Sequence, residues 1–115
     1  MYAVVDLETT GTSVKTGSRI IQIGCVLVQD GQVINEFETK INPRTVVPLT
    51  IEQLTGIKNN DVKGAPLFED VAPTLKSLLD DTIFVAHNVN FDFPFLNAEF
   101  ERAGEAPLTI PAIDT

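Results

Sequence analysis

The sequence predicts an α/β protein whose first half forms strands and whose second half alternates helices with short strands. Apolar, β-branched runs occupy residues 2–7, 19–29 and 33–41. From residue 66 onward, apolar side chains recur at helical spacing around one short apolar run at residues 83–86. A chain of 115 residues that is 43% hydrophobic is the size of one domain with one core. We therefore expect a single mixed sheet with flanking helices.

The three runs of the first half are expected to form an antiparallel meander. Residues 2–7 are rich in valine and lead into polar residues and Gly11, a pattern typical of a strand buried on both faces. The second run is followed by Asp30-Gly31, a dipeptide that tolerates the positive φ angles of a two-residue hairpin turn. The third run then returns alongside the second.

Two helices are expected between residues 50 and 80. Thr50 to Gln53 fits a capping box, and Gly56 can end the short helix that follows. Pro66 fits the first turn of the next helix, which is expected to stop near Asp80-Asp81. The buried face of that helix is predicted to consist of Leu67, Val71, Leu75, Leu78 and Leu79.

A strand, a third helix and the start of another strand complete the prediction. Residues 83–86 read as a short buried strand, and residues 90–103 as a helix that Gly104 ends. Pro94 falls early enough in that helix to be tolerated. Residues 108–113 resemble the beginning of one more strand. The inward side chains of the helix are predicted to be Phe91, Phe95, Leu96 and Phe100, whereas Phe93 is expected to face a substrate groove.

The charge balance and the single cysteine narrow the class of protein. Eight Lys+Arg against 16 Asp+Glu give a net charge of −8, which excludes a basic clamp for DNA or anionic lipid but not a contact bridged by metal. Cys25 lies in an apolar run and is expected to be a buried thiol. The sequence shows neither a signal peptide nor a membrane span, so we expect no membrane contact and a reducing, cytoplasmic location.

Asp6 and Glu8 are the first candidate catalytic residues. Because they lie two residues apart on a predicted strand, both carboxylates point to the same face. Like charges this close raise each other's pKa unless a cation or hydrogen bonds compensate, and oxygen ligands suit Mg²⁺ or Mn²⁺. An isolated Asp-x-Glu is more often a solvated pair at a strand end, so the interpretation needs support from other segments.

Two further segments supply this support. Thr9-Thr10-Gly11 follows directly and offers hydroxyls, amides and close backbone approach to a phosphate or a 3′-hydroxyl. At the junction of the fourth strand and the third helix, the polar turn from His87 to Asp92 places Asp92 in the first helical turn. The helix dipole favours a carboxylate there, but this effect alone does not account for the whole polar turn.

Three sequence segments carry a resemblance to a known family. They are VVDLETTG at 4–11, LTGI at 54–57 and VAHNVNFDFPFL at 85–96. These segments resemble the first two exonuclease motifs, and the segment between them, of the DnaQ-like 3′→5′ exonucleases of the RNase H-like fold. The similarity extends over essentially the whole chain. It is strongest to the exonuclease domain of Gram-positive DinG-type helicases and to the proofreading domain of DNA polymerase III.

The resemblance implies a two-metal hydrolase. Asp6, Glu8 and Asp92 would be the catalytic residues and the ligands of two Mg²⁺ or Mn²⁺ ions. The substrate would be the 3′ end of single-stranded DNA, hydrolysed to nucleoside 5′-monophosphates as part of a helicase or polymerase. Many relatives carry His where Thr55 stands. The residues expected to contact the terminal nucleotide are Thr9, Thr10, Gly11, Leu54, Thr55, Asn88 and Phe91.

The chain departs from the family pattern after its second motif. The common subclass carries a fourth carboxylate and a general base in a later His-x4-Asp, which is absent here. His87, the single histidine, is expected to order its turn through hydrogen bonds, so no general base is assigned. We therefore interpret residues 1–115 as the N-terminal two thirds of one domain whose C-terminal part is missing. Alone it is expected to bind metal weakly and to hydrolyse little or nothing. It is also expected to form homodimers, because the missing helices would leave one sheet face and the Phe cluster of the third helix partly uncovered.

Two alternatives stay open at this point. One is a non-catalytic module that holds a single-stranded 3′ end or a partner protein. The other is an RNA-trimming exoribonuclease of the same fold, since the choice between DNA and RNA depends on contacts to the 2′-hydroxyl. Gln22 stands where relatives often carry Glu, and we interpret it as an ordinary strand position.

Overall fold

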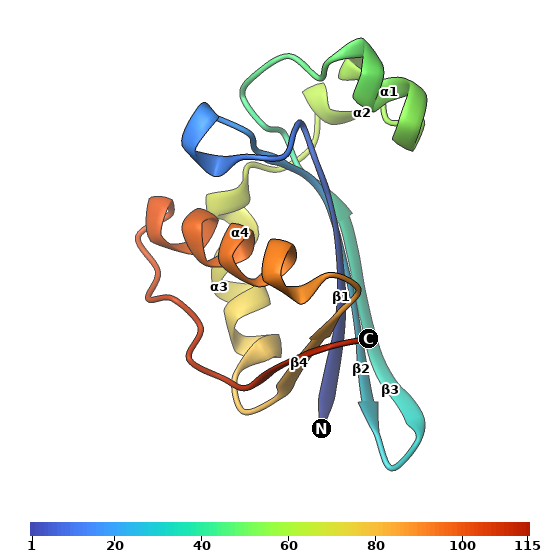
Figure 1. The fold of residues 1–115 in the computed structure, drawn as a ribbon, viewed down its shortest axis with the longest axis vertical. Helices are drawn as coiled ribbons and strands as arrows, with labels where there is room; N and C mark the ends of the chain where they lie inside the picture. The colour runs from blue at the N-terminus through green and yellow to red at the C-terminus, as the bar shows by residue number, and fades with distance from the viewer.

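The computed structural model describes residues 1–115 and contains one five-stranded sheet with the order β3-β2-β1-β4-β5 (Figure 1). The strands are β1 (Tyr2–Thr9), β2 (Ile20–Gln29), β3 (Gln32–Lys40), β4 (Ile83–Ala86) and β5 (Ala112–Asp114). The first three pair antiparallel, and β4 pairs parallel with both β1 and β5. The predicted mixed sheet with a three-strand meander is therefore confirmed.

The turn between β2 and β3 has the predicted conformation. Asp30 adopts φ 55° and Gly31 adopts φ 76°, so both central residues have the positive φ of a type I′ turn. Gln29 pairs with Gln32 directly across this turn. The turn thereby sets the register with which β3 enters the sheet.

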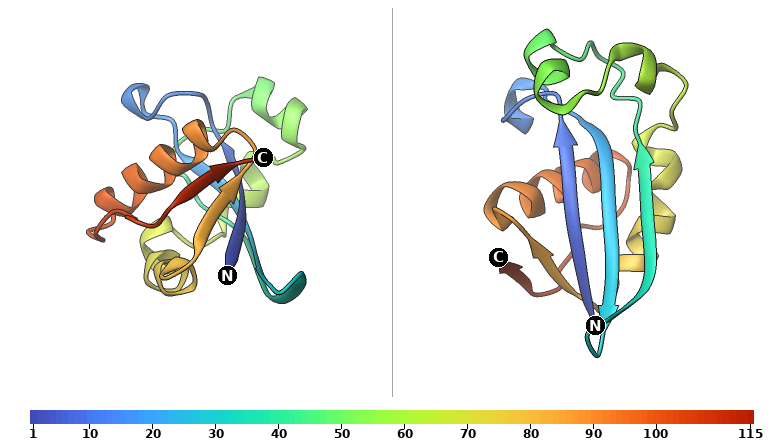
Figure 2. Two further views of the ribbon diagram at one scale, coloured as in Figure 1. Left: turned by 60° about the horizontal axis from the view of Figure 1, so that its bottom comes forward. Right: turned by 90° about the vertical axis from the view of Figure 1, so that its right-hand side faces the viewer.

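Two helices, α3 (Phe68–Leu79) and α4 (Val89–Arg102), cover one face of the sheet, and no helix lies over the other face (Figure 2). On β1, Ala3, Val5 and Leu7 point into the main core beneath these helices, whereas Tyr2 and Val4 remain 46% and 41% exposed. The expectation that this strand is buried on both faces is therefore wrong. The apolar residues of this strand occupy consecutive positions, so the sequence does not indicate that helices cover only one of its two faces.

The helices α1 (Leu49–Thr55) and α2 (Asn59–Lys63) lie beyond the carboxyl end of β1. They share a small second core with β2, composed of Ile21, Val47, Ile57 and Val62. The predicted capping box is wrong, because α1 already begins at Leu49, with Pro48 as its N-cap and no side-chain cap bond. Gly56 ends the helix at φ 77°, as predicted. The five-residue α2 is too short to show helical periodicity in the sequence and was not predicted.

The start of α3 also differs from the prediction. Pro66 precedes the helix instead of occupying its first turn, since Leu67 is the N-cap residue and donates its amide to the Asp70 carboxylate at 3.0 Å. Leu67, Val71 and Leu78 are only partly buried. The buried face consists of Phe68, Ala72, Leu75 and Leu79. The end of the helix at Asp80 agrees with the prediction.

The position of α4 agrees with the sequence to within one residue at each end. It is followed by Gly104 at φ 84°. Phe95 and Phe100 are buried, and the Phe93 ring packs edge-on against Phe84 with the ring centroids 5.0 Å apart. The expectation of a Phe93 that faces a groove is therefore wrong. The Phe cluster is partly exposed, as expected, because Phe91 and Phe93 are only half-buried. The last strand begins at Ala112, later than predicted, because residues 108–111 precede the pairing with β4.

Cys25 is buried in the main core, as predicted, and burial raises the pKa of its thiol to about 11. None of the helices has the length and apolar character needed to cross a bilayer.

Candidate active site

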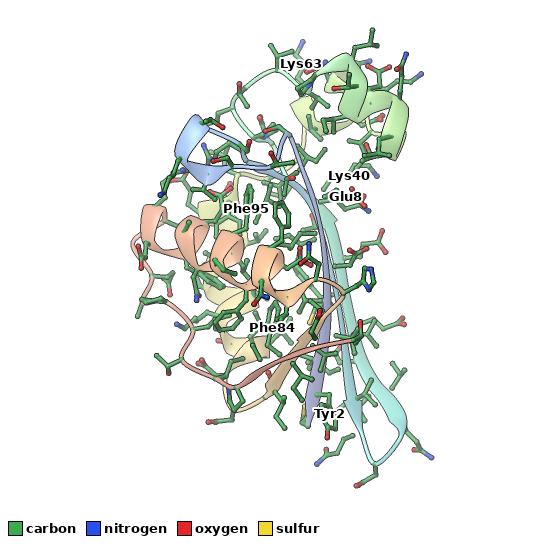
Figure 3. The ribbon with its side chains drawn as sticks, viewed as in Figure 1. Tyr2, Glu8, Lys40, Lys63, Phe84 and Phe95 are labelled. Carbon is green, nitrogen blue, oxygen red and sulfur yellow. The ribbon has the colours of Figure 1, made fainter.

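Asp6 and Glu8 lie near the carboxyl end of β1, on the face of the sheet that α3 and α4 leave open. Asp6 pairs with Gly24 and Glu8 pairs with Gln22 of β2. Asp6 is exposed and Glu8 is half-buried. Figure 3 shows Glu8 on the side of β1 away from Phe84 and Phe95, near the end of the sheet where α1 lies. The prediction that both carboxylates share one face is confirmed by the burial of the alternate residues between them.

The parallel pairing of β1 and β4 brings Asp92 to the same region. The two strands are parallel, and Val85 of β4 pairs with Val4 of β1. The chain therefore leaves β4 beside the part of β1 that carries Asp6, and it turns directly into α4. Asn88 makes this turn in the left-handed conformation at φ 63°. Its carbonyl accepts the amides of Phe91 at 2.9 Å and Asp92 at 3.3 Å. Asp92 consequently sits in the first turns of α4 and is 6% exposed.

Burial and neighbouring charge raise the pKa of two of the three carboxyl groups, Asp92 and Glu8. The pKa of Asp92 is raised to about 6, first by burial and then by the charges of Asp6 and Glu8, while His87 opposes the shift. Burial and the charge of Asp6 raise the pKa of Glu8. The salt bridges of the molecule involve Glu99 and Glu69, so none of these three carboxylates forms an ion pair, and only His87 partly offsets the charge of Asp92. Uncompensated acidic groups drawn from two elements are typical of functional sites.

The chemistry of this donor set fits a hard divalent cation. The structure contains no group of three or more His, Cys, Asp or Glu side chains arranged to hold a metal ion. Mg²⁺ is usually held by one or two carboxylates together with water and substrate phosphates, so a closed protein cage is not required. The mutual repulsion of Asp6, Glu8 and Asp92 is the observation that makes them suitable ligands.

The segment after Glu8 is held by its own hydrogen bonds. The Thr9 hydroxyl donates to the Gly11 carbonyl at 2.6 Å. The buried Thr10 donates its amide to the Arg19 carbonyl at 2.8 Å, and its hydroxyl oxygen accepts the Arg19 amide at 2.9 Å. A β-carbon on Gly11 would meet the Ser18 hydroxyl oxygen at 2.6 Å, so a larger residue would displace this hydroxyl, which accepts the Ser13 amide at 3.3 Å. The proposed contacts of Thr9, Thr10 and Gly11 with a nucleotide stay predictions.

Further predicted substrate residues lie on α1 and in the first turn of α4. Leu54 of α1 is 80% exposed, while the Thr55 hydroxyl donates to the Ile51 carbonyl at 2.8 Å and accepts the Ile57 amide at 3.1 Å. Phe91 is half-buried against Phe95, with ring centroids 5.3 Å apart. An open groove of about 400 Å³ is lined by Phe91 together with Thr12, Ser13, Val14, Lys15, Asn90, Pro94, Phe95 and Ala98.

His87 and Gln22 are polar residues near the candidate site whose roles were predicted from the sequence. His87 is exposed and takes part in none of the side-chain hydrogen bonds, so it does not order the turn in the expected way. The Asp114 carboxylate, which accepts the Val89 amide at 3.0 Å, holds the start of α4 instead. Gln22 donates to the Glu38 carboxylate at 2.9 Å and is an ordinary strand residue, as predicted.

Sequence reasoning missed Glu99, whose side chain is almost completely buried. It lies on α4 seven residues after Asp92, which places both carboxylates on the same side of the helix. This spacing was the available signal, because a charged residue on the apolar side of a helix indicates a partner in the fold.

Comparisons with known proteins agree on one family. The family model RNase_T, described as exonuclease, matches residues 3–115. The chain is 47% identical over 103 residues to the 3′-5′ exonuclease DinG of Bacillus subtilis (strain 168), a match that covers 90% of this chain and 11% of that protein. It is 41% identical over 114 residues to the PolC-type DNA polymerase III of Staphylococcus haemolyticus (strain JCSC1435), covering 99% of this chain and 8% of that protein. The chain thus spans about a tenth of the length of these relatives.

Solved structures show the same fold. Exonuclease X in complex with 5′ overhanging duplex DNA aligns with a TM-score of 0.73 at 24% identity, covering 99% of this chain and 59% of that one. E. coli exonuclease I in complex with a 5cy-dA13 oligonucleotide aligns with a TM-score of 0.87 at 20% identity, covering 98% of this chain and 28% of that one. The fold is therefore the RNase H-like fold that the motif resemblance implies.

Proposed function

We propose, from the premise that this chain belongs to the RNase_T exonuclease family, that it acts as the 3′→5′ exonuclease domain of a larger DNA-processing protein. Its substrate is the 3′ end of single-stranded DNA, from which it releases nucleoside 5′-monophosphates by hydrolysis. The observation that carries this proposal is the convergence of Asp6, Glu8 and Asp92 from β1 and α4. None of these carboxylates forms a salt bridge with a basic side chain.

In this proposal Asp6, Glu8 and Asp92 are the catalytic residues and hold Mg²⁺ or Mn²⁺ in a two-metal site. When bound, the ions supply positive charge that acidifies an attacking water and offsets the charge developing at the phosphate. The residues of the chain prepare this site in two ways. β1 presents two carboxylates on one open face, and α4 buries the third, which ionises as the pH rises through about 6.

Several features support a nucleic-acid end as the substrate of an acidic protein. Affinity for a strand end comes from metal, backbone amides and stacking, and none of these requires a basic surface. Leu54 offers an exposed apolar side chain at the site's end of the sheet, and Phe91 lines the adjoining open groove. The remaining proposed contacts to the terminal nucleotide are Thr9, Thr10, Gly11, Thr55 and Asn88.

We propose a helicase or polymerase as the protein context and the cytoplasm as the compartment. The named relatives are an exonuclease DinG and a PolC-type DNA polymerase III, which both favour DNA replication or repair. The buried free thiol of Cys25 suits a reducing compartment.

Calorimetric titration with Mn²⁺ tests the metal site. The variant Asp6→Ala/Glu8→Ala should lose the binding heat of the wild type. The control Glu101→Ala/Glu105→Ala removes two carboxylates from the last turn of α4 and the residues after it, away from β1, and should keep that heat. Equal heats for the wild type and Asp6→Ala/Glu8→Ala would contradict the proposal.

A nuclease assay tests the reaction. Single-stranded DNA labelled at its 5′ end should shorten stepwise from the 3′ end in Mn²⁺, and Asp6→Ala/Glu8→Ala should abolish this shortening. We expect slow release at stoichiometric amounts of the chain, because no general base is assigned. Binding of the 3′ end without release of mononucleotides would identify a non-catalytic binding module. Faster release from the oligoribonucleotide of the same sequence would identify an exoribonuclease.

A further inference from the structure

The buried polar and charged residues of this chain are few, and three of the four lie on the two segments that carry the proposed ligands. They are Thr10, Thr82, Asp92 and Glu99. Thr82 bonds its hydroxyl to the Leu79 carbonyl at the end of α3, so it has a local role. The other three lie on β1's continuation and on α4, which are the two segments that carry the proposed ligands.

We propose that Glu99 is a positioning residue, which holds α4 and therefore Asp92 at a fixed distance from the end of β1. This inference rests on the proposed function, in which Asp92 acts together with Asp6 and Glu8. Glu99 itself touches none of these three residues and is not a catalytic residue.

Glu99 is 1% exposed, and its carboxylate accepts hydrogen bonds from one other segment and from its own helix. Arg19 donates through Nε to both carboxylate oxygens at 3.1 and 3.2 Å, and the Ile20 amide donates at 3.1 Å. Arg102 of the same helix adds a bond at 2.9 Å. The bonds from Arg19 and Ile20 attach the last turn of α4 to the start of β2.

A second pair of bonds continues this connection to β1. Arg19 donates its amide to the Thr10 hydroxyl oxygen, and Thr10 donates its amide to the Arg19 carbonyl. Thr10 follows Glu8 by two residues. The β1–β2 pairing changes register between Glu8 and Thr9, so the strand ladder is irregular where the candidate ligands end. The side-chain network from Thr10 through Arg19 to Glu99 spans this irregular part.

The geometry of α4 converts this attachment into the placement of Asp92. Glu99 and Asp92 are seven residues apart, nearly two full turns, so they lie on the same side of the helix about 10 Å from each other. A helix of this length is stiff along its axis. Fixing Glu99 against β2 therefore limits the sliding and rotation that would move Asp92 away from Asp6 and Glu8.

A purely stabilising role explains the network less well. A buried ion pair contributes little net stability, because the desolvation of both charges offsets their attraction, and an apolar set of the same volume often serves as well. Charge-assisted hydrogen bonds are directional, so they define the relative position of two elements. An apolar contact has no preferred direction and defines this position less precisely. The small hollow that Glu99 lines is mostly charged, and its other lining residues are Arg19, Arg44, Phe68, Glu69, Arg102 and Ala103.

Three variants separate positioning from stability. Glu99→Gln keeps the volume of the side chain but removes the charge that Arg19 and Arg102 bind. Leu75→Ala removes a fully buried side chain from α3, outside the network, and serves as the matched destabilised control. Glu101→Gln removes an exposed charge next to the network on the same helix. If Glu99→Gln does not fold, Arg19→Lys replaces it, because lysine keeps the charge and lacks the Nε donor.

The first measurement is the dissociation constant for Mn²⁺, taken by calorimetry at a temperature at which circular dichroism shows every variant to be folded. Glu99→Gln should weaken Mn²⁺ binding about tenfold, the low end of the effect of supporting residues around metal sites. Leu75→Ala and Glu101→Gln should bind as the wild type does. Wild-type affinity in Glu99→Gln, or an equal loss in Leu75→Ala, would overturn the inference.

The second measurement does not depend on metal and so distinguishes failure of this inference from failure of the proposed function. Amide hydrogen exchange in the metal-free protein should quicken together at residues 8–11 and 89–92 in Glu99→Gln, and in Leu75→Ala it should not. If Asp6→Ala/Glu8→Ala leaves Mn²⁺ binding unchanged, the proposed function fails and this exchange pattern alone decides about Glu99. Unchanged exchange at both segments in Glu99→Gln would overturn the positioning role.

Discussion

Asp92 shows how burial and neighbouring charge act on one side chain. Its carboxylate is 6% exposed, lies near Asp6 and Glu8, and has a pKa raised to about 6. At neutral pH the folded protein therefore contains a buried negative charge beside two others. Such a charge is unfavourable for folding in the absence of metal and favourable for binding a cation.

We predict that Asp92→Asn stabilises the metal-free protein above pH 6. The folded pKa of Asp92 lies above the unfolded value near 3.8, so its contribution to stability is fully present below about pH 4 and is lost as the pH rises through about 6. At pH 8 the free energy of unfolding of the variant should therefore be about 2 kcal/mol higher than that of the wild type. Below pH 4 the free energies of unfolding of the two proteins should change with pH in the same way. Urea unfolding with a chelator present measures this difference. Unfolding curves whose separation does not change with pH would contradict the assignment.

Gly11 illustrates a steric requirement that comes from a neighbour. We predict that Gly11→Ala destabilises the protein by about 1 to 3 kcal/mol, because the new β-carbon would meet the Ser18 hydroxyl oxygen at 2.6 Å. Adding Ser18→Ala should recover part of this loss, since it removes that oxygen. Thermal unfolding of both single variants and the double variant gives the coupling energy. Strictly additive losses would show that Ser18 is not the cause.

The elements of the fold differ in how locally they are specified. The β2–β3 hairpin depends on two residues with positive φ. The helix α4 is preceded by Asn88 and followed by Gly104, and both of these residues also have positive φ. These signals act within a few residues. The attachment of α4 to β2 through Glu99 instead joins residues that are 80 positions apart in the sequence.

We predict that Gly31→Ala destabilises the β2–β3 hairpin by about 1 kcal/mol, because alanine is strained at φ 76°. Gly64→Ala is the matched control. Gly64 has φ −97° and no atom within 4 Å of an added β-carbon, so this substitution should be nearly neutral. Chemical denaturation of both variants measures the difference. Equal losses would argue against the type I′ turn as the determinant of the register.

The whole molecule has one covered and one open sheet face (Figure 2), and Asp6 and Glu8 lie on the open one. Apolar side chains also remain exposed on the strands. They are Tyr2, Val4, Val33, Ile34 and Ile113. The Phe cluster of α4 is less exposed, since Phe95 and Phe100 are buried and Phe91 and Phe93 are half-buried.

Homodimer formation stays a prediction, now assigned to the open sheet face. Removing exposed apolar area from water favours association, so Tyr2→Thr/Val4→Thr should shift the protein toward monomer. Leu54→Ser, which removes an exposed leucine from α1 instead of the sheet, should leave the association unchanged. Sedimentation velocity over a range of concentrations measures both effects. A wild type that is monomeric throughout would contradict the prediction.

Local patterns account for the parts of the fold that were predicted correctly. The meander, the hairpin and the bounds of α4 each follow from apolar runs and turn residues close together in the sequence. The incorrect expectations concern tertiary contacts. Thr50 fits a capping box, yet the helix begins before it, and Phe93 is placed by its contact with Phe84 and not by a groove.

The sequence by itself determined the family, the order of strands and helices, and the identity of Asp6, Glu8 and Asp92 as the candidate ligands, because these depend on motifs and on spacing along the chain. Only the tertiary structure decided which face of β1 is open, how closely Asp92 approaches the other two carboxylates, and that Glu99 is buried against Arg19. The physical reason is that burial and charge coupling arise between residues distant in sequence, and their strength depends on the packing of whole elements.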